Sequence, residues 1–132
     1  KTFCVQKINP DNFSIFAQDE YEGVSCTIVR TKSDPRVAKA FADYWVDTSR
    51  GGLIVKRDTW FQGRLASTTA CTYRESEGNW IPDRLKIDSF NGGKLDESYR
   101  LKFVEVKLND PIDVKEFQLI PEPGMVVRKL DD

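Results

Sequence analysis

A series of strand-length segments separated by short turn signals constrains the fold of this chain more than any other feature. The segments cover residues 53–61, 65–74, 80–90 and 99–108. Two of the links between them are the glycine-containing tripeptides Gln62-Gly63-Arg64 and Glu77-Gly78-Asn79, and Asn91-Gly92-Gly93-Lys94 precedes the last segment. Links this short join antiparallel neighbours, because a parallel pair needs a long crossover. The sequence therefore predicts an antiparallel meander.

The residues before this meander also predict strands. Residues 2–8 and 13–16 flank the turn Asn9-Pro10-Asp11-Asn12 and indicate a hairpin. Residues 23–31 alternate between apolar and polar side chains, which is the pattern of a half-buried strand. We expect a loop and then a strand at residues 44–47, although Asp34 and Pro35 could also begin one or two helical turns over residues 36–42. Asp47-Thr48-Ser49-Arg50-Gly51-Gly52 is a predicted turn.

The alternation within the meander predicts which side chains share a face. Ile81, Leu85 and Ile87 have one parity, and Arg84, Lys86 and Asp88 have the other.

The last segment changes parity along its length. Tyr99, Leu101 and Phe103 have one parity, whereas Val104, Val106 and Leu108 have the other. A one-residue bulge near Phe103 would restore a single apolar face and bend the sheet. We therefore expect a mainly β fold with few or no helices, a strongly curved antiparallel meander that forms an incomplete half β-barrel.

Length and charge limit the possible functions. The 132 residues suffice for one domain with one core. Twenty Lys and Arg against 21 Asp and Glu give no net field that would attract nucleic acid or an anionic membrane. Apolar runs such as Val126-Val127 are far shorter than the roughly 20 residues that span a bilayer. Because Phe3-Cys4-Val5 resembles the middle of a strand, we expect the chain to be part of a longer protein.

Catalytic and metal sites find little support in the sequence. The chain has no histidine, which removes Ser-His and Cys-His pairs and the commonest transition-metal ligand. The carboxylate pairs Asp19/Glu20, Glu75/Glu77 and Asp96/Glu97 lie in or beside predicted turns, and Gly92-Gly93 lacks the continuation of a phosphate-binding loop. We predict a protein without enzymatic activity, metal or cofactor.

The three cysteines are Cys4, Cys26 and Cys71. Their wide spacing does not suit a zinc site, and we interpret them as small buried strand residues. A Cys4–Cys26 disulfide is the alternative.

The side chains of the meander suggest a binding surface. Most of its aromatic residues should form the core, and the remainder would line a groove for an acyl chain or an apolar peptide. By strand parity, the groove candidates are Leu53, Val55, Phe61, Tyr73, Ile81, Leu85, Ile87, Leu101 and Phe103. Trp60 and Phe90 have the opposite parity and, if exposed, would mark a patch on the convex side. The basic residues Arg57, Arg74, Arg84, Arg100 and Lys102 have acidic neighbours, so we expect a solvated outer face and no nucleic-acid site.

Several motifs between residues 44 and 127 occur in a familiar order. They are Trp45-Val46-Asp47 before Gly51-Gly52-Leu53, Gly78-Asn79-Trp80-Ile81-Pro82, Val106-Lys107-Leu108-Asn109, and Phe117-Gln118-Leu119-Ile120-Pro121-Glu122-Pro123-Gly124. This order resembles the C-terminal part of bacterial outer-membrane lipoprotein-sorting proteins of the LolA/LolB-like superfamily. The resemblance implies an unclosed antiparallel barrel whose concave apolar face accepts lipid chains under a helical lid. No long amphipathic helix is present here, so residues 1–132 would form a single domain without the helical part of that fold.

Together these observations predict a non-enzymatic binding domain, and the resemblance implies that it acts in the periplasm or cell envelope. Its ligand would be a lipoprotein acyl chain or another lipid, held by apolar burial on the concave face. The alternative is a protein-interaction or sensory domain that binds a partner segment through the face or edge of the sheet.

Overall fold

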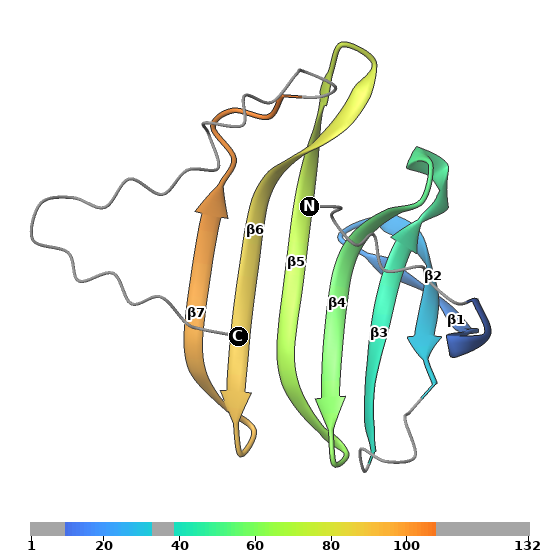
Figure 1. Ribbon diagram of the computed structural model, residues 1–132, viewed down its shortest axis with the longest axis vertical. Coiled ribbons are helices and arrows are strands. Elements are labelled where there is room, and N and C mark those ends of the chain that lie inside the picture. The colour runs from blue at the N-terminus through green and yellow to red at the C-terminus, as the bar shows by residue number, and fades with distance from the viewer. Residues whose placement is uncertain (1–9, 33–38, 108–132) are drawn as a thin grey trace, which may run out of the picture.

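A single antiparallel sheet makes up the computed structural model, which describes residues 10–32 and 39–107. Its seven strands lie side by side in chain order (Figure 1). They are β1 Phe13–Tyr21, β2 Val24–Thr31, β3 Ala40–Asp47, β4 Leu53–Phe61, β5 Arg64–Ser76, β6 Asn79–Asn91 and β7 Lys94–Lys102. The helical residues in the described ranges are the short 3-10 segments η1 Pro10–Asn12 and η2 Thr48–Arg50. The predicted mainly β, unclosed antiparallel meander is therefore confirmed.

Two-residue turns connect four of the hairpins. They are Glu22-Gly23, Gln62-Gly63, Glu77-Gly78 and Gly92-Gly93, and both residues of each turn have positive φ. This conformation matches the twist of antiparallel strands, and glycine adopts it without steric cost. Turns of this kind fix the ends of β4, β5 and β6 close to the positions predicted from the sequence.

The last strand lies elsewhere than predicted. Pairing resumes directly after Gly92-Gly93 with Asn91 opposite Lys94, so β7 covers residues 94–102 and not 99–108. Phe103, Val104 and Val106 follow the strand, and Leu108 lies outside the described residues. The bulge expected near Phe103 is absent from β7, whose register shift instead lies between Leu95 and Glu97.

The first strand also differs from the prediction. β1 continues to Tyr21 and pairs with β2, whereas the sequence predicted a short strand paired with residues 2–8. Those residues lie outside the described part of the chain. The sequence did not predict the Glu22-Gly23 turn, because the end of β1 carries Asp19 and Glu20 and shows no apolar alternation. β3 begins at Ala40, before the predicted residue 44.

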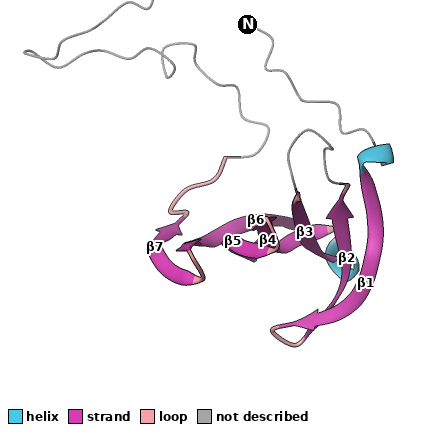
Figure 2. Ribbon diagram, turned by 90° about the horizontal axis from the view of Figure 1, so that it is seen from below, coloured by secondary structure: helices cyan, strands magenta, loops and turns pink. Residues whose placement is uncertain are grey.

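Register shifts give the sheet its curvature. The pairings β1–β2, β3–β4, β4–β5, β5–β6 and β6–β7 each contain one. An extra residue in one strand increases the local twist and bends that strand. The hairpin of β1 and β2 consequently stands steeply to the row formed by β4–β7, and the two edges of the sheet stay apart (Figure 2).

The sheet has two unlike faces, which we name by their relation to this hairpin. The hairpin face carries the side chains of Ile28, Asp43, Lys56, Thr68 and Lys86, which the register places in one series. The turn of the β1–β2 hairpin lies over this face, because Tyr21 and Glu22 line a cleft together with residues of β5, β6 and β7. The opposite side is the open face, with Val29, Tyr44, Arg57, Thr69 and Ile87 in series.

The core of the described residues is small. Its buried apolar side chains are Cys26, Ile28, Ala42, Val55 and Ile81. Buried carboxylates accompany them at Asp43, Asp47 and Asp58. A buried carboxylate is costly unless it is paired, so the hairpin face requires matching cations and donors.

Cations between aromatic rings meet this requirement. Arg30 makes two hydrogen bonds to Asp43, of 2.6 and 2.8 Å, and lies over the rings of Phe16 and Phe41. Lys56 forms an ion pair with Asp58 at 3.0 Å and lies near the rings of Trp45 and Tyr21. Tyr21 belongs to β1 and Lys56 to β4, so the cation–π contact joins the hairpin to the centre of the sheet.

Asp47 closes the corner between β3 and β4. Its side chain is 0% exposed and caps η2 by accepting hydrogen bonds from Ser49 N at 3.0 Å and Ser49 Oγ at 2.6 Å. The Arg50 guanidinium donates to the second carboxylate oxygen. The hydrogen bonds from Ser49 and Arg50 lower the pKa of Asp47 despite its burial. The turn predicted at residues 47–52 is thus confirmed, with Gly51 in the left-handed conformation.

We expect Asp47→Ala to lower the free energy of unfolding by about 2–3 kcal/mol at pH 7, because several hydrogen bonds to a buried charge are lost. Since the pKa of Asp47 is lowered on folding, this contribution is complete above the unfolded value of about 3.9 and declines as the pH falls through the folded value. Urea denaturation of the wild type and of Asp47→Ala at pH 7 and pH 3 measures both effects. An equal difference at the two pH values would contradict the role assigned to the carboxylate.

Candidate functional site

A set of apolar side chains on the open face of β4–β7 is the candidate binding surface. In cross-strand rows, Leu101 lies opposite Leu85 and Tyr99 lies opposite Ile87. Tyr73 follows on β5, and Ile54 adjoins it on β4, where the Tyr73 hydroxyl donates to the Ile54 carbonyl at 2.8 Å. We call this set the apolar patch: Ile54, Tyr73, Leu85, Ile87, Tyr99 and Leu101.

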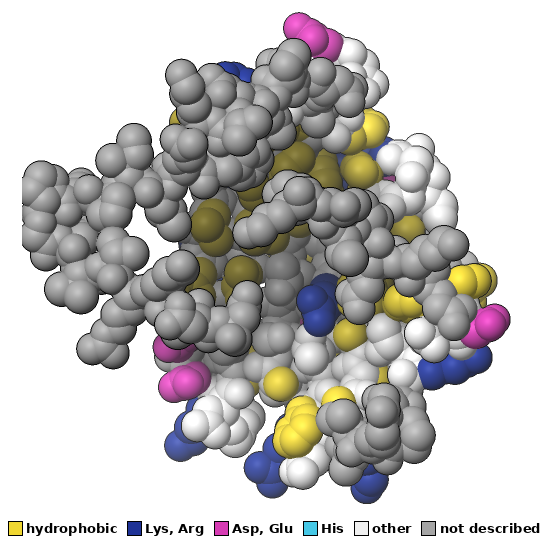
Figure 3. All heavy atoms as spheres, viewed as in Figure 1, with side chains coloured by type: hydrophobic (Ala, Val, Ile, Leu, Met, Phe, Trp, Pro, Cys, Tyr) yellow, Lys and Arg dark blue, Asp and Glu magenta, His cyan; other side chains and the backbone are white. Residues whose placement is uncertain are grey.

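The apolar patch is accessible at its outer members. Tyr99 is 53% exposed and Leu101 is 50% exposed, and Ile54 is also exposed. Hydrophobic side chains are visible over the middle of the sheet on the side that faces the viewer in Figure 3. Exposed clusters of this kind often mark sites that bind proteins or lipids.

No charge develops within the patch near neutral pH. Burial, together with Cys71, raises the pKa of Tyr73 to about 12. The hydrogen bond that Tyr99 donates to Glu97 Oε2, at 3.0 Å, raises the pKa of Tyr99. Both hydroxyls therefore stay neutral, and the patch offers apolar surface with two hydroxyl groups.

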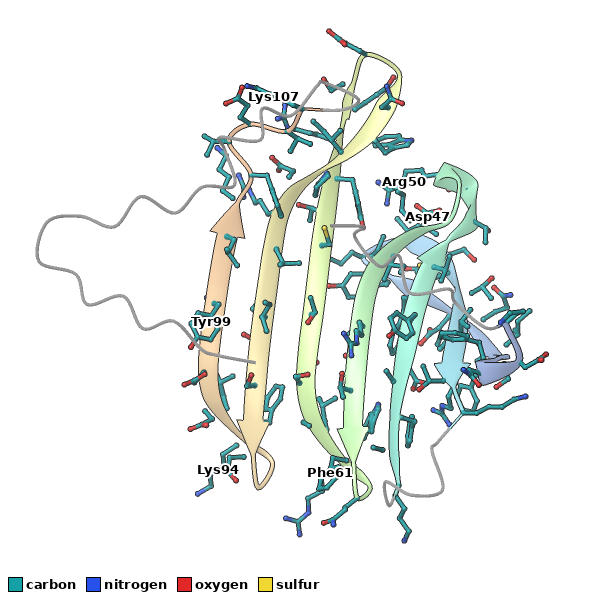
Figure 4. All side chains as sticks on the ribbon, viewed as in Figure 1. Asp47, Arg50, Phe61, Lys94, Tyr99 and Lys107 are labelled. Atoms are coloured by element: carbon teal, nitrogen blue, oxygen red, sulfur yellow. The ribbon has the colours of Figure 1, made fainter. Side chains whose placement is uncertain are left out.

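The structure brings together four of the nine groove residues predicted from the sequence. Tyr73, Leu85, Ile87 and Leu101 belong to the apolar patch. Phe61 also points to the open face, but it is the last residue of β4 and lies apart from Tyr99 (Figure 4).

The other four predicted residues lie elsewhere. The register places Leu53 and Ile81 on the hairpin face, and Val55 is buried beside Tyr21 and Val24. Phe103 lies beyond β7, where its backbone N–H donates to the Asp83 carbonyl at 2.8 Å. The prediction that Ile81 shares a face with Leu85 was wrong because Asp83 is an extra residue in β6, between Pro82 and Arg84.

Sequence reasoning missed Tyr99 and Ile54 as members of the patch. Tyr99 was assigned to the start of a strand, whereas it lies in the middle of β7 opposite Ile87. The signal that could have identified it is Gly92-Gly93, a turn that starts the next strand immediately.

The convex patch suggested for Trp60 and Phe90 is absent. Trp60 is half-buried and stacks on Phe41 on the hairpin face, with ring centroids 6.1 Å apart. Phe90 is also half-buried.

The cysteines of the described residues are free thiols. Cys26 is 0% exposed, and burial raises the pKa of its thiol, as expected for a structural strand residue. Its free state gives no support to a Cys4–Cys26 disulfide, and Cys4 lies outside the described residues. Cys71 lies opposite Leu85 on the open face.

Within residues 10–32 and 39–107, no group of three or more Cys, Asp or Glu side chains is arranged to hold a metal ion. The same ranges contain no helix long and apolar enough to cross a membrane.

No family model, curated protein or solved structure matches this chain. The resemblance to lipoprotein-sorting proteins thus stays a prediction from the motifs.

Substitutions in the apolar patch and in the core should differ in their effect on stability. Ile81→Ala should lower the free energy of unfolding by about 2–5 kcal/mol, because this side chain is only 3% exposed. Leu101→Ala should lower it by less than about 1 kcal/mol, because half of that side chain is already in water. Urea denaturation measures both. A comparable loss for Leu101→Ala would assign the patch to the core and remove it as a binding surface.

Proposed function

We propose that this domain binds the hydrocarbon chain of a lipid or an acylated protein on the apolar patch. The observation that supports the proposal is the contiguous set formed by the exposed Leu101 and Tyr99 and the half-buried Leu85 and Ile87 on two adjacent strands. Location in the cell envelope is part of the same proposal and comes from the resemblance to lipoprotein-sorting proteins.

Apolar burial would supply the binding energy. Each methylene group removed from water contributes about 0.8 kcal/mol when fully buried, and less on a surface that covers one side of the chain. The two tyrosine hydroxyls are already engaged, with Ile54 and Glu97. These hydroxyls need no hydrogen-bonding partner on the ligand, so the choice of ligand would depend on the shape of its apolar part. No chemical step is required.

The open edge of the sheet supports a second candidate, the binding of an extended partner segment. Every residue of β7 is exposed, and β6 is its only strand neighbour among the described residues. A partner strand could pair with this edge. The register shift at Asp96 and the charged side chains of β7 are, however, features that discourage edge pairing. The apolar patch is therefore the better supported site.

We expect the purified wild-type domain to take up palmitic acid or a palmitoylated peptide, observed by native mass spectrometry without detergent. Leu101→Glu should reduce uptake at least tenfold with the fold retained, because a carboxylate would be placed in the apolar contact. The double variant Arg100→Gln/Lys102→Gln changes the other face of the same strand and should bind like the wild type.

Absence of uptake by the wild type, or equal uptake by Leu101→Glu, would contradict the proposal. Binding of an unacylated peptide that is lost when proline is placed in β7 would favour the edge.

A further inference from the structure

Four cationic side chains gather on the hairpin face of β6 and β7. Arg84 lies opposite Lys102, and Lys86 lies opposite Arg100, in successive same-face pairs of the ladder. We call these four residues the basic cluster. Adjacent strands are about 4.8 Å apart, and same-face neighbours along a strand are about 6.8 Å apart. Like charges directly opposite each other destabilise a strand pair, so the cluster has an energetic cost.

The carboxylates around the basic cluster compensate only part of its charge. Lys86 forms an ion pair with Asp88 at 2.9 Å, and Arg84 lies 3.6 Å from Asp83. In the described part of the chain, neither Arg100 nor Lys102 forms an ion pair, and Arg100 Nη1 donates only to Ser98 Oγ at 3.4 Å. Within residues 10–32 and 39–107, these two cations of β7 therefore form no ion pair with a carboxylate, although the charge of Arg100 contributes to the lowered pKa of Asp88.

The carboxylate of Asp88 is already engaged. It accepts a hydrogen bond from Ser98 Oγ at 2.6 Å and pairs with Lys86, and these contacts lower its pKa. The Asp88 carboxylate stays ionised near neutral pH. It lies opposite Ser98, in the same-face pair next to the Lys86–Arg100 pair. An excess of positive charge consequently remains at Arg100 and Lys102.

A cleft lies over the basic cluster. The four cations line it together with Tyr21 and Glu22 at the tip of the β1–β2 hairpin, and its volume is about 540 Å³. This volume is within the range of sites for small molecules. Among the described residues that line the cleft, Glu22 is the one carboxylate. Burial and then the charge of Glu22 raise the pKa of the Tyr21 hydroxyl.

We propose that this cleft binds a small soluble ligand that carries two or more adjacent phosphate groups. Two rows of cations fit a pair of linked anionic groups better than a single one, and Arg84 and Arg100 offer planar forks for phosphate oxygens. The hairpin tip forms the opposite wall of the cleft, so a flat membrane surface would be held away from the cluster. The four cations lie on the face opposite the apolar patch, although Leu85 and Leu101 of the patch also line the cleft. The inference does not depend on the function proposed for the patch.

Isothermal titration calorimetry with inorganic pyrophosphate at low ionic strength tests this inference. The wild type should bind pyrophosphate at least tenfold more tightly than orthophosphate, and its affinity should fall as salt is added. Arg100→Gln/Lys102→Gln should weaken pyrophosphate binding at least tenfold. The melting temperature should rise with pyrophosphate for the wild type and not for this variant.

The matched control is Arg64→Gln/Lys94→Gln, which removes the same charge at the other end of the sheet, where Lys94 lies (Figure 4). It should bind pyrophosphate like the wild type. Absence of pyrophosphate binding, equal weakening by both double variants, or binding to phosphatidylglycerol vesicles without binding to pyrophosphate would overturn the inference. Uptake of palmitic acid is measured separately, so failure at one site is distinguishable from failure at the other.

Discussion

The register shifts between neighbouring strands determine what each face of this sheet presents. A strand alternates its side chains strictly, so one extra residue reverses the facing of everything beyond it. The extra residue Asp83 places Ile81 among the buried residues of the hairpin face, whereas Leu85 and Ile87 point to the open face. Without that shift, Ile81 would share a face with Leu85 and Ile87. The side chains that the apolar patch includes therefore depend on the backbone as well as on the sequence alternation.

The same shifts bend the sheet, and the bend creates a need for charge pairing. Because the β1–β2 hairpin stands over the hairpin face, Asp43 and Asp58 are removed from water near the centre of the sheet. Arg30 and Lys56 neutralise these carboxylates and also contact aromatic rings. These ion pairs and cation–aromatic contacts thus supplement a core that has few apolar residues. Removal of either cation would leave its buried carboxylate unpaired.

The sequence allowed the fold class and the central strands to be predicted because glycine turns are local signals. β4 was predicted with its observed ends, since Gly51-Gly52 precedes it and Gln62-Gly63 follows it. The β1–β2 hairpin was missed because the end of β1 carries Asp19 and Glu20 and shows no apolar alternation, although its turn Glu22-Gly23 is of the same kind as Glu77-Gly78. The binding surface was predicted only in part. Parity locates residues on a face only as far as the next bulge, and a bulge such as that at Asp83 has no clear sequence signature. The cations of β6 and β7 were interpreted as a solvated face with balanced charge, because their grouping depends on cross-strand pairing.

The apolar patch and the basic cluster share the same two strands. Leu101 lies between Arg100 and Lys102 along β7, and Leu85 lies between Arg84 and Lys86 along β6. The two proposed ligands would therefore contact alternate side chains of the same strand pair. β7 is the edge strand and is exposed along its whole length, so it gains little stability from burial. A ligand on either face would bridge β7 to β6 and stabilise the paired state of this edge. The two faces would then be coupled through the stability of a single strand, and also through Leu85 and Leu101, which belong to the apolar patch and line the cleft.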